Sequence, residues 1–317
     1  MKTIYKKFIF IVLSVFAGVE VFAQQDAQYT QYMYNTIAIN PAYAGSRDVL
    51  SIVGLHRSQW VGIDGAPRTQ TLSLHSPLGF TRSGLGGTII HDKIGPVTES
   101  QFNIDYSYTI PTSNTGKLSF GIKATANLMS VNYDELKRFD LDDSEYDQLV
   151  NNRFSPNVGA GLFYYTDTFY AGLSVPNFLE TKHFDSDVVT LTDSSSSSFI
   201  AKERLHYYFT IGKTFDLSDV VLFKPALLTK ATVGAPLQVD VSANFLFHEK
   251  LTLGLAYRWD AALSALVGFQ VSDALMLGFA YDRETTELEQ YNDGSFELIV
   301  RYELFKKYKG ITTPRFF

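Results

Sequence analysis

Polar and apolar residues alternate one by one along most of this chain, in runs that reach about ten to twelve residues. From Lys117 to Leu128, every second residue is Leu, Phe, Ile or Ala, and the residues between them are Lys, Ser, Gly, Thr or Asn. Successive side chains of a β-strand point to opposite faces, so such a run makes a strand with one apolar and one polar face. Most strands of soluble proteins have about five or six residues, whereas a tilted strand needs about nine to eleven to cross the hydrocarbon layer of a membrane. The alternation therefore indicates membrane-spanning strands.

Fourteen such runs can be counted, and the connections between them alternate in length. The runs cover residues 49–59, 69–77, 84–91, 98–110, 116–128, 156–165, 168–175, 204–216, 220–229, 236–247, 251–258, 262–271, 275–282 and 295–305. Connections 78–83, 111–115, 166–167, 217–219, 248–250 and 272–274 are compact and share one end, whereas the three longest, 129–155, 176–203 and 283–294, share the other. Outer-membrane barrels have short periplasmic turns and longer extracellular loops. We predict an all-β fold, a transmembrane antiparallel β-barrel of about 14 strands with both termini in the periplasm.

The start of the chain predicts a secretory signal peptide. Three lysines precede a short apolar run, and the segment closes with a small residue at Ala23. The apolar run is too short for a membrane-spanning helix. We expect a signal peptide over residues 1–23, a periplasmic or lumenal segment over 24–48, an outer-membrane barrel over 49–305 and a periplasmic tail over 306–317.

The composition excludes several classes of function. Lys and Arg number 27 against 33 Asp and Glu, so no basic excess favours binding to nucleic acid. The absence of Cys excludes disulfides, thiolate metal sites and cysteine nucleophiles. A mean hydropathy of −0.02 is the average of a lipid-facing and a lumen-facing stripe. Tyrosines near strand ends are expected to form the aromatic girdles of the barrel: Tyr106, Tyr108, Tyr164, Tyr165, Tyr207, Tyr208, Tyr257, Tyr281 and Tyr302.

Motifs for enzymatic chemistry are missing from the sequence. The six histidines show no close ligand pairing, and no Ser-His-Asp set can be assembled from sequence order. The acidic stretch from Asp140 to Glu145 resembles the start of a calcium loop but lacks its Gly and final Glu, so a solvated acidic loop is the alternative to a loosely held Ca²⁺. The Gly84-Leu-Gly86-Gly87 run is not followed by a helix, and we expect it to allow close approach of a neighbouring segment or a bulge. We expect no enzyme activity, no metal site and no cofactor.

Several short motifs together resemble the PorP/SprF family of outer-membrane proteins. They are Gln31-Tyr-Met-Tyr-Asn35, Asn40-Pro-Ala-Tyr-Ala-Gly45, Arg57-Ser-Gln-Trp60, Gly65-Ala-Pro67 and, at the end of the chain, Pro314-Arg-Phe316. The chain departs from the family pattern at Thr313, where Cys is common, and in the added Phe317.

The resemblance implies a non-enzymatic barrel of the type IX secretion and gliding motility system of Bacteroidetes, related in shape to fatty-acid transporter barrels. It implies as partners the C-terminal domain of a secreted adhesin and a periplasmic OmpA-like peptidoglycan-binding lipoprotein or other type IX secretion components. Outer-membrane lipid surrounds such a barrel.

Two sets of candidate site residues follow from placing these motifs on the predicted barrel. The first set is expected at the outer mouth, where a polypeptide would dock: Arg57, Gln59, Trp60, Gly65, Pro67 and Asp92. The second set precedes the first strand, on the periplasmic side or threaded into the lumen: Tyr32, Tyr34, Asn40, Pro41, Tyr43 and Gly45. Trp60 suits an interfacial aromatic as well as a docking anchor, and the glycines and prolines also suit turns.

Three functions remain open from the sequence. The first is an anchor or secretion-associated barrel that binds the C-terminal domain of a secreted adhesin. The second is an outer-membrane channel for hydrophobic or small solutes, and the third is a soluble exported β-sandwich. The fold by itself does not separate the first two, because barrels host many functions.

Overall fold

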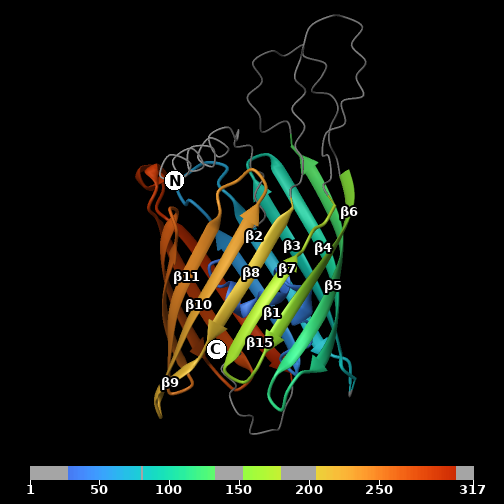
Figure 1. Ribbon diagram of the computed structural model, residues 1–317. Coiled ribbons are helices and arrows are strands. Elements are labelled where there is room, and N and C mark those ends of the chain that lie inside the picture. The colour runs from blue at the N-terminus through green and yellow to red at the C-terminus, as the bar shows by residue number, and fades with distance from the viewer. Residues whose placement is uncertain (1–27, 80, 133–152, 180–204, 305–317) are drawn as a thin grey trace, which may run out of the picture.

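The computed structural model describes residues 28–79, 81–132, 153–179 and 205–304, and these form one closed antiparallel β-barrel (Figure 1). Each strand pairs with its neighbour in the chain, except that β8 and β9 both pair with β10 and not with each other. The last strand pairs with the first over the register Leu50↔Leu304 to Ser58↔Phe296. The strands are β1 (Leu50–Ser58), β2 (Arg68–Pro77), β3 (Ser83–Ile94), β4 (Val97–Pro111), β5 (Lys117–Val131), β6 (Arg153–Tyr165), β7 (Phe169–Val175), β8 (His206–Lys213), β9 (Phe215–Ser218), β10 (Val221–Thr232), β11 (Gln238–Phe247), β12 (Leu251–Arg258), β13 (Ala262–Gln270), β14 (Leu275–Glu284) and β15 (Ser295–Leu304).

The barrel has 14 strands, because β8 and β9 are two parts of one. Both pair with β10, and they are separated by Thr214 alone. The predicted fold class is therefore confirmed, and each of the fourteen predicted runs coincides with a strand. The largest differences in bounds are three residues, in β3, β5 and β10, which extend to Ile94, Val131 and Thr232, and in β6, which begins at Arg153. In the described ranges, no helix has the length and apolar character needed to cross a membrane.

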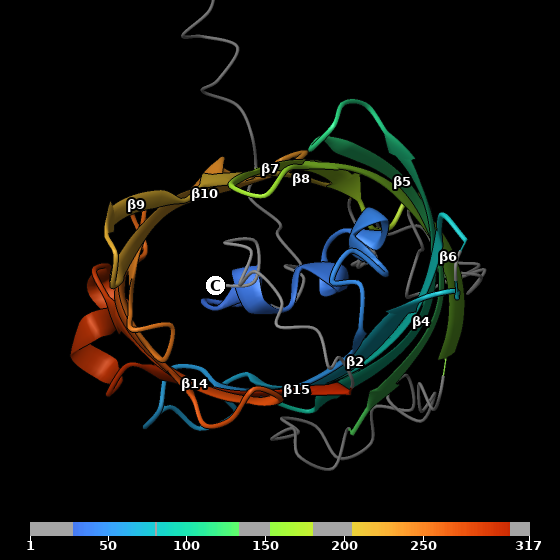
Figure 2. The same ribbon diagram turned by 90° about the horizontal axis from the view of Figure 1, so that it is seen from below.

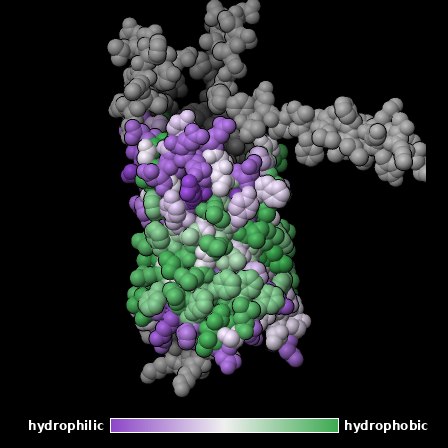
Figure 3. Space-filling model, turned by 90° about the vertical axis from the view of Figure 1, so that its left-hand side faces the viewer, coloured by the Kyte–Doolittle hydropathy of each residue, from purple (hydrophilic) through white to green (hydrophobic). Residues whose placement is uncertain are grey.

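The polarity of the barrel is inverted relative to a soluble protein, with apolar side chains outside and polar ones inside. Ile104 and Ile122 point outward and are 64% and 62% exposed, whereas their neighbours Asp105 and Lys123 point inward and are buried. Figure 3 shows the result on one face, where a hydrophobic band lies between hydrophilic ends. This is the side-chain distribution of a wall in contact with lipid.

Two of the tyrosines predicted for the aromatic girdles lie inside the barrel instead. Tyr165 and Tyr208 are 2% and 5% exposed, and both face the lumen. Each follows another tyrosine, Tyr164 or Tyr207, and successive residues of a strand face opposite sides. Only one member of each pair can therefore face the lipid.

The two ends of the barrel differ in their connections. Turns such as 166–168, 219–220 and 248–250 close one end, which we call the short-turn end. The other, the long-loop end, carries connections 59–67, 233–237 and 285–294, the last with the 3₁₀ helix η6 (Glu287–Tyr291). The acidic stretch at 140–145, the signal peptide over 1–23 and the tail over 306–317 lie outside the described residues.

Candidate functional site

The segment that precedes β1 fills the lumen of the barrel, and we call residues 28–48 the plug. It contains three single-turn 3₁₀ helices, η1 (Tyr32–Tyr34), η2 (Thr36–Ala38) and η3 (Pro41–Tyr43), which Figure 2 shows inside the ring of strands. Residues 29–44 are all buried, and burial raises the pKa of the Tyr32 and Tyr34 hydroxyls. All six lumen or plug residues selected from the sequence (Tyr32, Tyr34, Asn40, Pro41, Tyr43 and Gly45) belong to it.

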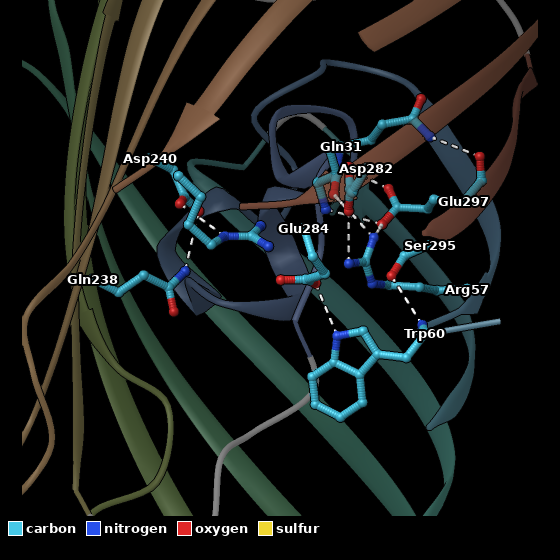
Figure 4. Close-up of polar contacts among 11 residues, drawn as sticks. Gln31, Arg57, Trp60, Gln238, Asp240, Asp282, Glu284, Ser295 and Glu297 are labelled. Carbon is cyan, nitrogen blue, oxygen red and sulfur yellow. Dashed lines mark hydrogen bonds and ion pairs between the residues drawn. The ribbon is translucent and has the colours of Figure 1, made fainter. Parts of the chain in front are cut away.

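The upper part of the plug is anchored by a buried charge cluster near the long-loop end (Figure 4). The Arg57 guanidinium, at the end of β1, lies 2.7 Å from Asp282 of β14 and 3.2 Å from Glu297 of β15. The two Glu297 oxygens accept hydrogen bonds from the backbone N–H groups of Thr30 and Gln31, at 2.9 and 2.8 Å. The Thr30 hydroxyl donates to Asp282 at 2.6 Å. The cluster therefore connects the plug to three neighbouring strands.

The middle of the plug is held by wall side chains that bind its backbone. Lys123 donates to the Ala38 carbonyl at 2.9 Å and lies 3.7 Å from Asp105. Ser174 of β7 donates to the Ile39 carbonyl at 2.7 Å, so the plug is also held by a strand other than the one that carries Lys123. These contacts supply partners for polar groups of an irregular backbone that would otherwise be buried without them.

The η3 turn is fixed by Asn40, which acts at once as a helix cap and as a link to the wall. Its side-chain oxygen accepts from the Ala42 N–H at 3.0 Å, and Pro41 occupies the first helical position. Its side-chain nitrogen donates to the Leu162 carbonyl of β6 at 3.0 Å. Asn before Pro is a favourable helix start because Asn satisfies a free N–H and Pro has none to satisfy.

Glycines of the wall make room for the plug. A Cβ at Gly84 would overlap the Ala44 carbonyl, and one at Gly86 would overlap the Ile37 side chain. This confirms the close approach expected for the Gly84-Leu-Gly86-Gly87 run. Inward-facing glycines at 121 and 161 play the same part opposite Ala42 and Asn40, and nothing in the sequence marked them.

The lower end of the plug is anchored close to the short-turn end. Arg47 forms an ion pair with Glu303 of β15, and the Gly45 N–H donates to Nδ1 of His75 at 3.1 Å. The Tyr43 ring packs edge-on against His75 and Phe163, with ring centroids 5.4 and 5.3 Å apart. The plug thus contacts the wall along the whole length of the lumen.

The residues selected for the outer mouth divide between the lumen and the loops. Arg57 is 1% exposed and belongs to the upper anchor inside the barrel. The indole N–H of Trp60 donates to Glu284 at 2.8 Å, and the Trp60 backbone N–H donates to Ser295 at 3.1 Å (Figure 4). Asp92 accepts from the Thr69 hydroxyl at 2.5 Å. These side chains are engaged by the wall of the barrel.

Connection 59–67 is tied to its neighbours through its backbone. The Gln59 N–H donates to the Pro67 carbonyl at 2.9 Å and closes the loop at its base. The Gly95 N–H donates to the Gly65 carbonyl at 2.8 Å, and Gly65 has a φ of 75°, which favours glycine. Val61 exchanges two hydrogen bonds, of 2.9 and 2.7 Å, with the end of connection 285–294. Three loops therefore form one continuous rim.

An apolar set of side chains at the same end was missed in the sequence. Its members are exposed and lie in three connections: Val233 (64%), Leu237 (61%), Trp259 (69%), Leu288 (41%) and Tyr291 (70%). Apart from Leu237, which the predicted run 236–247 contains, they lie outside the predicted strands, so the period-two pattern does not mark them. Exposed aromatic and aliphatic residues in the loops at one end of a barrel are candidates for a protein-binding surface.

The described ranges hold no group of three His, Asp or Glu side chains placed to bind a metal ion. The residues brought together in the lumen bind the plug. The arrangement can hold a segment of the chain in the lumen and present a rim of loops at the long-loop end.

The chain is similar to several solved structures and matches one family model. Solved structures that are similar include the CymD monoaromatic hydrocarbon channel, with 11% identity, a TM-score of 0.49 and coverage of 90% of this chain and 96% of that one. A FadL homologue of Pseudomonas aeruginosa is 12% identical, with a TM-score of 0.41 and coverage of 81% and 89%. These similarities carry no information on what this barrel binds or transports, and no curated protein matches the chain. The family model of the type IX secretion system membrane protein PorP/SprF matches residues 21–302. The chain belongs to the PorP/SprF family of outer-membrane β-barrels.

Proposed function

We propose that this barrel is a plugged anchor of the type IX secretion system, which binds the C-terminal domain of a large secreted adhesin at its long-loop end. The single observation that carries the proposal is the plug, whose residues 29–44 are buried within the lumen. A lumen filled by its own chain leaves the two ends of the barrel as the surfaces for function. The family is generally not enzymatic.

The rim at the long-loop end supports a polypeptide partner. Trp259 and Tyr291 are 69% and 70% exposed, and large aromatic residues supply much of the binding energy at protein interfaces. Connection 59–67 is joined by backbone hydrogen bonds to the connections on both sides of it. A pre-ordered rim of this kind loses little conformational entropy when a partner binds.

The alternative function is a channel for hydrophobic or small solutes. In a channel, the plug would have to leave the lumen or shift within it, because it occupies the path that a solute would take. The plug is anchored near both ends, by Arg57 with Glu297 above and by Arg47 with Glu303 below. Purified protein reconstituted in planar bilayers is therefore expected to be electrically silent, and steady conductance would favour the channel.

The short-turn end, where the last strand ends at Leu304, is proposed to face the periplasm and to meet the OmpA-like lipoprotein or another component of the system. The expectation that the segment before β1 also begins at this end does not fit the structure, because Thr30 and Gln31 lie in the upper anchor near the long-loop end. A cavity of about 240 Å³ opens at this end between the plug and the wall. Gly45 and Asp48 line it from the plug, and Arg82 and Lys117 line it from the barrel. A peptide carrying a carboxylate would find cationic partners there.

The decisive experiment compares adhesin retention in cells that carry variants of the rim. Trp259→Ala combined with Tyr291→Ala is expected to release the adhesin into the medium, because both side chains are exposed and neither supports a strand. Leu217→Ala is the matched control, since Leu217 is 57% exposed at the short-turn end. Co-purification from native membranes identifies the adhesin by mass spectrometry.

Two outcomes would contradict the proposal. One is a normal amount of surface adhesin in a strain that lacks the barrel. The other is equal retention in the rim double variant and the Leu217→Ala control, with all barrels present at the same level in the outer membrane.

A further inference from the structure

The outer wall of the barrel carries a groove between β15, β1, β2 and β3. Its volume is about 480 Å³, within the range of sites that take small ligands. The floor is apolar and includes Leu72, Ile89 and Val300. Gly54 creates the hollow, because a Cβ at this position would meet nothing within 4 Å. The groove is a recess in the surface that contacts lipid.

A polar row crosses the wall directly above this apolar floor. The strand register places His56 beside Gln70 and Gln70 beside His91, all exposed and facing outward. His56 and His91 each make a hydrogen bond with a serine, Ser58 at 3.2 Å and Ser100 at 2.9 Å. Polar side chains that face lipid are costly, which makes such a row a candidate for function.

One step nearer the long-loop end, the same face carries positive charge. Arg68 and Lys93 are cross-strand partners, both exposed on the outer face.

Along the outer wall, from the long-loop end toward the middle of the barrel, this face therefore carries first cations, then neutral polar side chains and then an apolar recess. This is the order of an anionic membrane lipid seen from its head group to its acyl chain. We propose that this groove is a binding site for one anionic lipid of the surrounding leaflet, with its phosphate on Arg68 and Lys93 and one acyl chain over Gly54. The inference is independent of the adhesin partner.

Charge complementarity selects this occupant. Basic side chains at a membrane surface attract anionic head groups, and burial of an acyl chain adds favourable free energy with each methylene. A second protein would meet a recess only a few residues across, flanked by outward Leu and Ile of the lipid-facing band. A lipid supplies both the chain and the phosphate in one molecule.

The test is native mass spectrometry of the full-length barrel in detergent, titrated with dioleoyl phosphatidylglycerol or dioleoyl phosphatidylcholine. The two lipids share their acyl chains and differ in net charge. The wild-type barrel is expected to bind the first lipid at one site at least about ten-fold more tightly than the second, which corresponds to roughly 1.4 kcal/mol.

Two variants separate the parts of the site. Arg68→Gln combined with Lys93→Gln is expected to remove the preference for phosphatidylglycerol, and Lys213→Gln combined with Lys250→Gln, two exposed cations elsewhere, is the charge control. Gly54→Leu is expected to fill the recess and weaken both lipids without strain inside the wall. The volume control is Ala265→Leu, an exposed alanine three strands away in the barrel order.

Three results would overturn the proposal. The first is equal affinity of the wild-type barrel for the two lipids. The second is unchanged lipid retention in both groove variants when heat-modifiability on gels shows them to be folded. The third is full displacement of the lipid by glycerol phosphate, which would assign the cations to a free anion and not to a lipid.

Discussion

Replacement of Arg57 by Met should open the upper part of the plug while the barrel stays folded. In the wild-type protein, the guanidinium is shared by Asp282 and Glu297, and the side chains of all three are at most 2% exposed. Both carboxylates also hold Thr30 of the plug. Without Arg57, two negative charges remain buried side by side, and separation of the plug from the wall lets water reach them.

The size of the effect follows from the burial of the cluster. Removal of one partner from a buried ion pair costs about 3–5 kcal/mol, because the remaining charge is uncompensated. Each 1.4 kcal/mol changes an equilibrium constant ten-fold. If the plug opens locally to relieve the charges, the open fraction should rise by about two to three and a half orders of magnitude.

The assay uses the absence of cysteine from the chain. A single Met33→Cys substitution places a thiol on the plug between the upper and middle anchors, where Met33 is 6% exposed. The rate of maleimide labelling in outer-membrane vesicles then reports how often the plug exposes this position. Arg57→Met should raise the labelling rate at least a hundred-fold.

The matched control is Arg258→Met. Arg258 is also buried in the lumen, and it donates to Asp240 at 2.9 Å, within the wall (Figure 4). Its loss leaves a buried carboxylate of the same kind but breaks no hydrogen bond to the plug. Equal labelling rates in the two backgrounds would refute the role of Arg57 as an anchor of the plug. The triple variant Arg57→Met/Asp282→Asn/Glu297→Gln, which carries no buried charge, should restore slow labelling.

Two further predictions concern the two faces of the wall. Gly86→Val should displace Ile37 and expose the plug to protease, whereas Gly87→Val should leave digestion unchanged, because a Cβ at Gly87 meets only ordinary contacts. Ile104→Lys, in the middle of β4, should lower the free energy of unfolding in lipid vesicles by about 2–4 kcal/mol, whereas Ile94→Lys, at the end of β3, should lower it by about 0–1 kcal/mol. Equal protease sensitivity in the first pair, or equal urea midpoints in the second, would contradict these assignments.

The strands of the barrel could be predicted because their signal is local. Alternation within ten residues, as in Lys117–Val131, depends only on which face of one strand meets lipid. The same rule fails where two successive residues have the same character, because it then does not tell which of them faces the lipid. In Tyr164-Tyr165 and Tyr207-Tyr208 both residues are aromatic, and the sequence does not show which one faces the lumen.

The contacts that hold the plug could not be predicted, because they join residues far apart in sequence. Thr30 and Glu297 are 267 positions apart, and they meet only because β15 closes the barrel on β1. The sequence places Arg57 at the end of a strand near the mouth of the barrel. Its burial follows only from the position of the plug, which the sequence does not show. The sequence around Gly121 does not distinguish it from other glycines, because its role depends on Ala42 of the plug, which packs directly against it.

The plug is held by three anchors in series, and this order decides how it can move. The upper anchor involves Arg57, the middle anchor Lys123, and the lower anchor Arg47. Complete release requires all three to break, so their costs add, whereas opening toward the long-loop end requires only the first. A partner that binds at the rim and competes for Asp282 or Glu297 would therefore shift the upper segment alone, with the middle and lower contacts still closing the lumen. Binding at the mouth and a closed barrel are compatible for this reason, and loss of the lower anchor should affect permeability without loosening residues 29–31.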